Sequence, residues 1–385
     1  MNFHSTCRLL SSPHFDIIVI GLGAAGSAAL FHVARTGATV LGIDRFVCPH
    51  THGSTHSESR IIRKSYSEGP QYLPLLNRAY TLWSELENAS ATKLMYLGGC
   101  LNIGRPDSEM VRAAQKTAIA GNTRHLLLSS DEVNQRYPGY RIQSDQIALV
   151  DLEAGYIQPE LCVRTHLRKA AMHGAQCQFG TPVLSCRAQQ GRVIVKTDLD
   201  TFEAPRVIVT AGAWMRDFAS VPLMVERVTN SWFTPTGLHF TPAQCPPFIL
   251  EDATGLKSYG CPDLGNGIKV GLHYAGQVVT HPKEINRKVG LEDEARARGV
   301  LEKVMPEAAG VCRKTTVCIY SNTPDKHYLI DRMYGDDEHV IVGSACSGHG
   351  FKASSAVGES LAALALDKPA PVDLSPFKWR WPTKT

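Results

Sequence analysis

The stretch Asp16–Gly26, with the sequence D-I-I-V-I-G-L-G-A-A-G, decides the fold of this chain. An apolar run of strand length leads into a G-x-G-x-x-G turn, and residues 27–36 are predicted to form a helix. A second apolar run, residues 38–43, ends at Asp44. Strand, glycine turn, helix, strand and acid in this order are the fingerprint of a βαβ unit that binds a dinucleotide. The sequence therefore predicts an α/β fold with a Rossmann-type domain.

Each part of the fingerprint has a physical role. Gly21 permits the tight turn, Gly23 lets a pyrophosphate approach the backbone, and Gly26 lets the helix pack closely on the strand. The helix N-terminus offers free N–H groups to the phosphates, and Asp44 is suited to bind ribose hydroxyls. A glycine-rich turn that binds nothing is the alternative interpretation. The fingerprint does not distinguish NAD from FAD.

The composition is that of a soluble globular protein with room for two domains. The chain has 385 residues, of which 43% are hydrophobic and 20% charged. The net charge of +4 is spread out, and no basic run predicts a nucleic-acid surface. The 11 cysteines contain no C-x-x-C pair, which favours reduced thiols in a reducing compartment.

Targeting signals are not evident. No apolar stretch has transmembrane length, and residues 1–15 are expected to be an extension before the first strand and not a signal peptide. The C-terminus, Pro-Thr-Lys-Thr385, lacks a peroxisomal signal of the S-K-L type. We therefore expect a cytoplasmic protein, with a peroxisomal location as the alternative.

Dinucleotide-type elements recur in the middle and at the end of the chain. The late strand at 340–343 enters the glycine-rich loop Ser347–Lys352, a second place where backbone N–H groups could meet a cofactor. We predict a discontinuous cofactor domain (residues 1–90, 150–220 and 315–385) and a sheet-rich substrate domain (91–149 and 221–314). Helices are predicted at 72–87, 131–137 with Ser130 as N-cap, 159–173, 292–304 and 354–366, and strands at 193–196, 206–210 and within 225–276.

Four segments downstream of the fingerprint carry a family resemblance. They are residues 52–69, the pair 259–262 and 267–273, residues 318–331, and residues 347–352. In these segments the chain resembles the monomeric sarcosine oxidase and N-methyltryptophan oxidase family of FAD-dependent amine oxidases. The spacing from Tyr259 to Lys269 leans toward the N-methyltryptophan branch. One departure is Ser57-Glu58-Ser59, where the family often has Gly-Asp-Thr.

The resemblance implies an oxidase whose cofactor is FAD. The enzyme would oxidise a secondary amine, such as N-methyltryptophan or sarcosine, to an imine that hydrolyses, while dioxygen becomes hydrogen peroxide. Pipecolate or a specialised biosynthetic amine are alternative substrates. An NAD-dependent dehydrogenase and a flavin-binding protein without turnover are alternatives of other classes. The implied partners are a small amine and dioxygen, without nucleic acid or membrane, and the protein would be a monomer.

The resemblance also implies roles for four reactive residues. Cys318 matches the cysteine that forms a thioether to the flavin 8α-methyl carbon, although a buried free thiol is the ordinary state of a cysteine. Lys269 matches the lysine that activates dioxygen, because a fixed cation stabilises superoxide as it forms. Arg63 and Lys352 match the cations that hold a substrate carboxylate. For these cations, solvated surface positions are the alternative.

Further residues of the matching segments would complete the site. Arg60 would stabilise the reduced, anionic flavin, unless it only pairs with Glu58 or Glu68. The histidines at positions 50, 52 and 56 lie on a loop without nearby acids in a fixed element, so we expect no metal site.

Aromatic and histidine side chains would line the pocket. His273, Tyr259 and Tyr320 match such positions, whereas His349 would support the loop backbone. The implied cofactor-binding residues are Gly21, Gly23, Gly26, Asp44, His56, Cys318, Gly348, Gly350 and Lys352.

Overall fold

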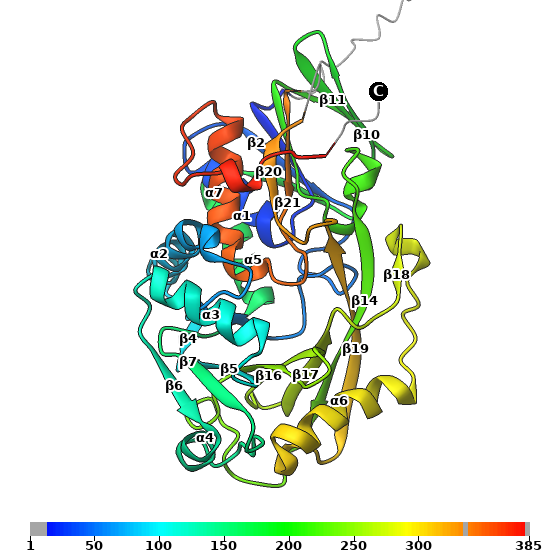
Figure 1. Cartoon of the computed structure of the whole chain (residues 1–385). Coiled ribbons are helices and arrows are strands. Elements are labelled where there is room, and N and C mark those ends of the chain that lie inside the picture. The colour runs from blue at the N-terminus through cyan, green and yellow to red at the C-terminus, as the bar shows by residue number, and fades with distance from the viewer. Residues whose placement is uncertain (1–13, 334–337, 382–385) are drawn as a thin grey trace, which may run out of the picture.

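The first βαβ unit forms as predicted. The computed structural model describes residues 14–333 and 338–381 (Figure 1). Strands β1 (Ile17–Ile20) and β2 (Val40–Asp44) pair in parallel, and α1 (Ala24–Ala34) connects them. The helix begins at Ala24 and not at Ser27, because Gly23 is its N-cap and the last glycine of the fingerprint already lies in its first turn. Every residue of both strands is buried, as expected for a parallel sheet covered on both faces.

The sheet built on this unit gathers strands from the whole described chain. Its order is β20-β21-β13-β1-β2-β9, with β20 antiparallel at one edge and the remaining pairs parallel. The prediction that elements from the start, middle and end of the chain belong together is confirmed. The further strands are β9 (Gln176–Phe179), β13 (Arg206–Val209), β20 (Leu329–Arg332) and β21 (Val340–Ser344).

The alternation of β1 side chains explains the layers around this sheet. Ile17 and Val19 belong to a core shared with helices, whereas Ile18 and Ile20 belong to a core shared with a three-stranded antiparallel sheet. The helices α1, α5 and α7 lie beside the sheet in Figure 1. The elements are α2 (Leu73–Ser90), α5 (Pro159–Met172), α7 (Ser354–Ala365), β10 (Val183–Gln189), β11 (Arg192–Thr197) and β12 (Thr201–Ala204).

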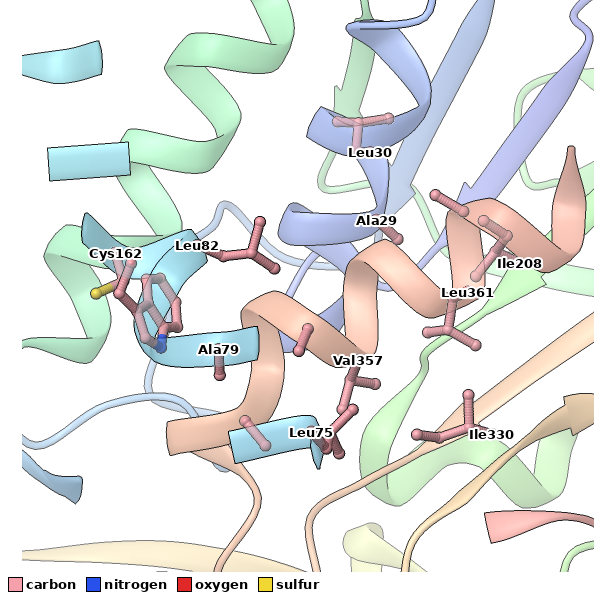
Figure 2. Close-up of a cluster of buried hydrophobic side chains, with 14 of the residues drawn as sticks. Ala29, Leu30, Leu75, Ala79, Leu82, Cys162, Ile208, Ile330, Val357 and Leu361 are labelled. Carbon is pink, nitrogen blue, oxygen red and sulfur yellow. The ribbon is translucent and has the colours of Figure 1, made fainter. Parts of the chain in front are cut away.

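The helical layer has a closely packed centre, which Figure 2 shows. Side chains from α2, α5 and α7 meet those of α1 and the sheet there, and each fully buried aliphatic side chain contributes about 1.5–3 kcal/mol. Gly358 lets α7 approach α1, because a Cβ at this position would overlap Ala28. The labelled residues are Ala29, Leu30, Leu75, Ala79, Leu82, Cys162, Ile208, Ile330, Val357 and Leu361.

A second, larger sheet follows the order β18-β14-β17-β16-β15-β5-β7-β6. Strands β18 and β17 pair with successive parts of one edge of β14, and β19 pairs with its other edge over residues 224–233. The strand-like character predicted for residues 225–276 is confirmed. The predicted domain boundary at residue 315 falls inside β19, and the division into two domains stays a prediction. The strands are β5 (Cys100–Gly104), β6 (His125–Ser129), β7 (Ile147–Asp151), β14 (Met224–Phe233), β15 (Phe248–Glu251), β16 (Lys257–Cys261), β17 (Ile268–His273), β18 (Val278–Val279) and β19 (Cys312–Asn322).

Shorter elements complete the described chain. The N-cap of α4 is Ser129 and not Ser130 as predicted, because the Ser129 hydroxyl accepts the N–H of Glu132 while that carboxylate accepts the N–H of Ser129. In the part of the chain that the structure describes, no helix is long and apolar enough to span a bilayer. The remaining elements are α3 (Glu109–Ala120), α4 (Ser130–Arg136), α6 (Leu291–Val304), β3 (Arg60–Ile62), β4 (Met95–Leu97) and β8 (Gly155–Ile157).

Candidate active site

Two adjoining cavities lie between the sheets. The first has an open volume of about 1080 Å³ and is lined by the glycine turn, by Asp44 and by the segment Ala211–Trp214. The second has an open volume of about 1140 Å³ and contains most of the predicted reactive residues. The cavities share wall residues, so together they form one elongated site. The shared residues are Ala24, Ala25, Ser54, Thr55, Ala345 and Cys346.

The glycine turn fits the diphosphate of a dinucleotide. Gly21 has φ +87°, and a Cβ there would lie 2.6 Å from the Thr210 carbonyl oxygen. A Cβ at Gly26 would overlap the Gly21 carbonyl oxygen. Gly23 is open toward the cavity, with Thr55 Oγ1 the nearest atom at 3.5 Å from such a Cβ. The N-terminus of α1 therefore faces space in which an anion could bind its free N–H groups.

Asp44 is held by the backbone at the wall of the first cavity. Its Oδ2 accepts the N–H of Leu22 at 2.7 Å, and its Oδ1 accepts the N–H of Phe46 at 2.8 Å. His50 Nε2 lies 3.7 Å from Oδ1. Asp44, Cys48 and His50 each have one atom that could bind a metal ion, and these three atoms lie within 4.8 Å of one another. The backbone bonds orient the carboxylate, and its predicted role toward a ribose stays a prediction.

The wall of the second cavity follows from strand alternation. On β16 and β17, Tyr259 faces Gly271 and Cys261 faces Lys269, so side chains at every second position lie on the same face. Cys318 and Tyr320 show the same spacing on β19. The residues that line the cavity from these strands are Lys257, Ser258, Tyr259, Cys261, Lys269, His273, Cys318 and Tyr320, and only Ser258 departs from this alternation.

Lys269 is a buried cation on this wall. Its side chain is 2% exposed, so the solvated-edge alternative is wrong. Nζ donates to the carbonyl of Ser57 at 3.1 Å and also to that of Ser59. Burial lowers the pKa of Lys269 to about 8, and the two carbonyls compensate part of the lost hydration of the ammonium group.

Arg63 is also buried, and it meets a carboxylate that the sequence analysis did not assign to the pocket. Its guanidinium donates to the Ser65 carbonyl at 2.8 Å and to Asn102 Oδ1 at 2.9 Å, and it lies 3.5 Å from Glu68 Oε2. Burial alone would raise the pKa of Glu68, but Arg63 and its neighbours lower it to about 2. Glu68 is therefore ionised beside Arg63.

Lys352 lies near the same carboxylate and is held by an inner polar network. Its Nζ donates to the His349 carbonyl at 2.6 Å and lies 3.4 Å from the Tyr66 hydroxyl. That hydroxyl is hydrogen-bonded to His349 Nδ1, while His349 Nε2 lies 2.9 Å from the Lys326 carbonyl. Burial lowers the pKa of Lys352 to about 7. Arg63, Lys352 and Glu68 together leave a positive charge that a ligand carboxylate could neutralise.

The aromatic residues surround a neutral histidine. His273 Nδ1 lies 3.1 Å from the Tyr320 hydroxyl, and burial lowers the pKa of His273 to about 3. Tyr259 donates to Asn230 Oδ1 at 2.9 Å. Gly348, with φ +75°, keeps this region open, because a Cβ there would lie 2.7 Å from the ring of His273.

Cys318 and Arg60 lie side by side on the wall of the second cavity, next to the carbonyl of Ser54, a residue that both cavities share. The guanidinium is 3.7 Å from Sγ and donates to the carbonyls of Ser59 at 2.9 Å and Ser54 at 3.0 Å. Burial raises the pKa of the Cys318 thiol, and the positive charge of Arg60 opposes this effect. No ion pair joins Arg60 to Glu58 or Glu68 in the described structure, so the alternative in which Arg60 only pairs with them is wrong.

Not every predicted residue reaches the walls. His56 is buried next to Ser57, with its Nδ1 3.0 Å from that hydroxyl, and is absent from both linings, whereas His349, Gly348 and Gly350 line the second cavity. The sequence analysis missed Glu68 and Lys257 as wall residues. Glu68 lies close to Arg63 in sequence, and Lys257 stands two positions before Tyr259 on the same strand. These short distances in sequence to predicted site residues could have indicated that Glu68 and Lys257 also belong to the wall.

Comparisons with known proteins show the family of this chain. The profile of the "FAD dependent oxidoreductase" family matches residues 16–364. The chain is 37% identical over 363 residues to a monomeric sarcosine oxidase from Streptomyces avermitilis, covering 92% of this chain and 94% of that protein. It is 34% identical over 367 residues to an N-methyl-L-tryptophan oxidase from Yersinia pestis, covering 94% and 98%.

Solved structures show the same fold. NikD, described as an unusual amino acid oxidase of nikkomycin biosynthesis, superposes with a TM-score of 0.85 at 20% identity, covering 95% of this chain and 98% of that chain. A glycine oxidase from Geobacillus kaustophilus superposes with a TM-score of 0.79 at 16% identity, covering 96% and 100%.

Proposed function

Since the chain belongs to the family of FAD-dependent oxidoreductases and is an amine oxidase within it, we propose that its substrate is a secondary amine of the N-methyl amino acid class. Family membership identifies FAD, and not NAD, as the dinucleotide. The observation that supports the substrate class is the second cavity, where Arg63 and Lys352 offer cations to a carboxylate and Lys269 offers a separate one.

In the proposed reaction, the amine, water and dioxygen account for all atoms, electrons and protons. The amine loses two electrons and two protons and becomes an imine, which water hydrolyses to a primary amino acid and, for an N-methyl group, formaldehyde. Dioxygen takes up two electrons and two protons and leaves as hydrogen peroxide. FAD, when bound, supplies the transfer of the electron pair from the amine to dioxygen.

The chain's own residues orient and protect the reacting groups. Arg63 and Lys352 hold the substrate carboxylate, and Glu68 offsets part of their charge. Tyr259 and Tyr320 exclude water, and neutral His273 can hydrogen-bond an uncharged amine without competing for its proton. Lys269 stabilises the negative charge that develops on dioxygen.

Two further roles concern the cofactor. We propose that Arg60 would stabilise the reduced, anionic flavin and that Cys318 would form a thioether to the flavin 8α-methyl carbon. The thiol S–H bond and one C–H bond of the methyl group would break, and the two electrons and two protons released would pass to dioxygen, which becomes hydrogen peroxide. Support for the thioether comes from the position of Cys318 in the wall of the second cavity, next to a cation that favours the thiolate. Flavin colour that stays with the precipitate after acid treatment of the purified protein is the expected result. Colour released into the supernatant would contradict attachment.

A substrate panel tests the proposed function. The purified holoenzyme is mixed with sarcosine, N-methyl-L-tryptophan and L-pipecolate in air, and hydrogen peroxide is measured. We expect peroxide with at least one N-methyl amino acid and none with the matching N-methyl amine that lacks the carboxylate. Peroxide with pipecolate alone would favour a cyclic amine as substrate, and no peroxide with a wider panel of secondary amines would favour a flavoprotein without turnover.

We propose that the protein acts as a cytoplasmic monomer. The name of the 37% identical relative supports a monomer, and the free thiols at Cys48, Cys261 and Cys346 support a reducing compartment such as the cytoplasm. Light scattering should then give the mass of one 42.1 kDa chain, and a fluorescent fusion should fill the cytoplasm. A dimer mass or punctate organelles would contradict them.

A further inference from the structure

The turn that holds Lys269 has an unusual backbone. Ser57 and Glu58 have φ angles of +85° and +65°, a region that residues with a side chain seldom adopt. The N–H of Ser59 donates to the carbonyl of Ser57 at 2.7 Å, which closes a three-residue turn around Glu58. A turn of this kind persists only where other contacts hold it.

The side chain of Glu58 supplies such contacts. Its carboxylate accepts from Trp232 Nε1 at 3.0 Å, from Asn266 Nδ2 at 3.1 Å and from Lys314 Nζ at 2.6 Å. Trp232 belongs to β14 and Lys314 to β19, and the Lys314 ammonium also lies 4.4 Å from the Trp232 ring centroid. One carboxylate therefore ties the turn to two strands of the large sheet.

The other side of the turn faces Lys269. The carbonyls of Ser57 and Ser59, which flank Glu58, both accept from Nζ. Trp232 stands directly opposite Lys269 in the pairing of β14 with β17. Trp232, which binds the Glu58 carboxylate, and Lys269 are thus fixed to each other by the pairing of β14 with β17. A shift of the turn would therefore move its two carbonyls relative to Nζ.

We propose that Glu58 is a positioning residue for the oxygen reaction, because its carboxylate fixes the turn whose carbonyls hold Lys269 Nζ at the cavity wall. The proposal rests on the proposed function, in which Lys269 stabilises the charge on reduced dioxygen. At the departure Ser57-Glu58-Ser59, the glycine that the family often has falls at Ser57, whose φ of +85° a glycine would adopt without strain. In this chain the contacts of Glu58 help to hold a serine in that conformation.

The charge of Glu58 adds a second, measurable effect. Burial is the main influence on the Lys269 ammonium, and removing a nearby negative charge would lower its pKa further. Fewer lysines would then be protonated at pH 8. The other titratable or charged groups that face Lys269 are Cys261 of β16, Arg60 of β3, Glu160 of α5, Cys318 of β19 and His56.

Stopped-flow measurement of the two half-reactions tests the proposal. Holoenzyme is reduced anaerobically with the best amine of the panel and then mixed with dioxygen between pH 6 and 9. Glu58→Gly suits the positive φ but lacks the carboxylate, and we expect ~10-fold slower flavin reoxidation at pH 8. The midpoint of its pH profile should move to lower pH, while anaerobic reduction stays within ~3-fold of wild type.

Three further variants make the result specific. Glu58→Gln keeps an acceptor for Trp232 and should fall between Glu58→Gly and wild type, with the same direction of pH shift. Glu302→Gln removes an exposed carboxylate of α6 and should match wild type. Lys269→Met measures the contribution of the lysine itself.

The outcomes separate this inference from the proposed function. Wild-type reoxidation in Glu58→Gly and Glu58→Gln, with slow reoxidation in Lys269→Met, overturns only the role of Glu58. Normal reoxidation in Lys269→Met overturns the assigned role of the lysine and the inference with it. Equal slowing of both half-reactions without a pH shift in Glu58→Gln assigns a merely structural role to Glu58 and also overturns the inference. If Glu58→Gly does not fold, the pH profile of Glu58→Gln decides.

Discussion

At the scale of single residues, burial makes the charges of the second cavity depend on pH. The pKa of Lys352 is lowered to about 7 and that of Lys269 to about 8, while that of Glu68 is lowered to about 2. Near neutral pH, Glu68 is thus ionised, Lys269 is mostly protonated, and Lys352 divides between its charged and neutral forms. The two lysines should therefore lose their functions in different pH ranges.

Carboxylate binding should weaken as the pH rises above 7. Below this pH Lys352 is protonated and attracts a carboxylate, and above it the lysine becomes neutral. The binding free energy of the carboxylate should then weaken by at most about 1.4 kcal/mol per pH unit. Acetate has no amine to titrate, so its Kd, measured from the flavin spectrum between pH 6 and 9, isolates this effect. We expect a Kd that rises with pH in wild type and a weaker, flatter response in Lys352→Gln. A pH-independent wild-type Kd would refute the assignment.

The sequence could predict those site residues whose motif is continuous along the chain. Lys269, Arg63 and Lys352 each lie in such a segment, and the structure brings them to one cavity. The contacts of Glu58 could not be predicted, because Trp232 and Lys314 approach it only through the pairing of β14 and β19. Long-range strand register is not encoded in any local pattern.

At the scale of elements, the approach of α1 to α7 depends on the absence of one side chain. Gly358→Ala would place a methyl group against Ala28, and overpacking of this kind typically destabilises a protein by about 1–3 kcal/mol. Gly299→Ala in α6 is the matched control, because the added Cβ would meet nothing within 4 Å apart from the neighbouring backbone of its own helix. It should be neutral or stabilising by up to about 1 kcal/mol. Thermal unfolding of the two holoenzymes compares them, and equal melting temperatures would contradict the packing argument.

Periodicity predicted the elements better than their ends. The apolar spacing within residues 72–87 yields α2, whose buried face includes Leu75, Leu76 and Trp83. The start of α4 was misplaced by one residue, because Ser129 and Ser130 are adjacent and only the geometry of Glu132 selects between them.

At the scale of the whole molecule, several histidines are buried in neutral form. Burial lowers the pKa of His32, His56, His166 and His273 to about 3 each. The unfolded chain binds a proton at each of these residues below pH 6.5, while the folded chain does not until about pH 3. Stability should therefore fall as the pH decreases through this window.

The histidine of α5 offers a direct test of this acid sensitivity. His166 packs against Phe31 and Trp83, so phenylalanine suits its place. Between pH 7 and 5, His166→Phe should lose about 2 kcal/mol less unfolding free energy than wild type in urea titrations. His173 is exposed at the end of the same helix. The control variant His173→Phe should lose as much unfolding free energy between pH 7 and 5 as wild type. An identical loss in all three proteins would disprove the effect.

The joined cavities also bear on the order in which the enzyme is assembled during synthesis. The wall of the first cavity already combines the glycine turn with Ala211–Trp214 and with residues 343–346, and Cys318, Tyr320 and Lys352 line the second cavity. A ribosome must therefore release nearly the whole chain before a complete pocket for the cofactor exists. We therefore expect FAD to be captured only after translation, so that a chain truncated before residue 343 would be colourless.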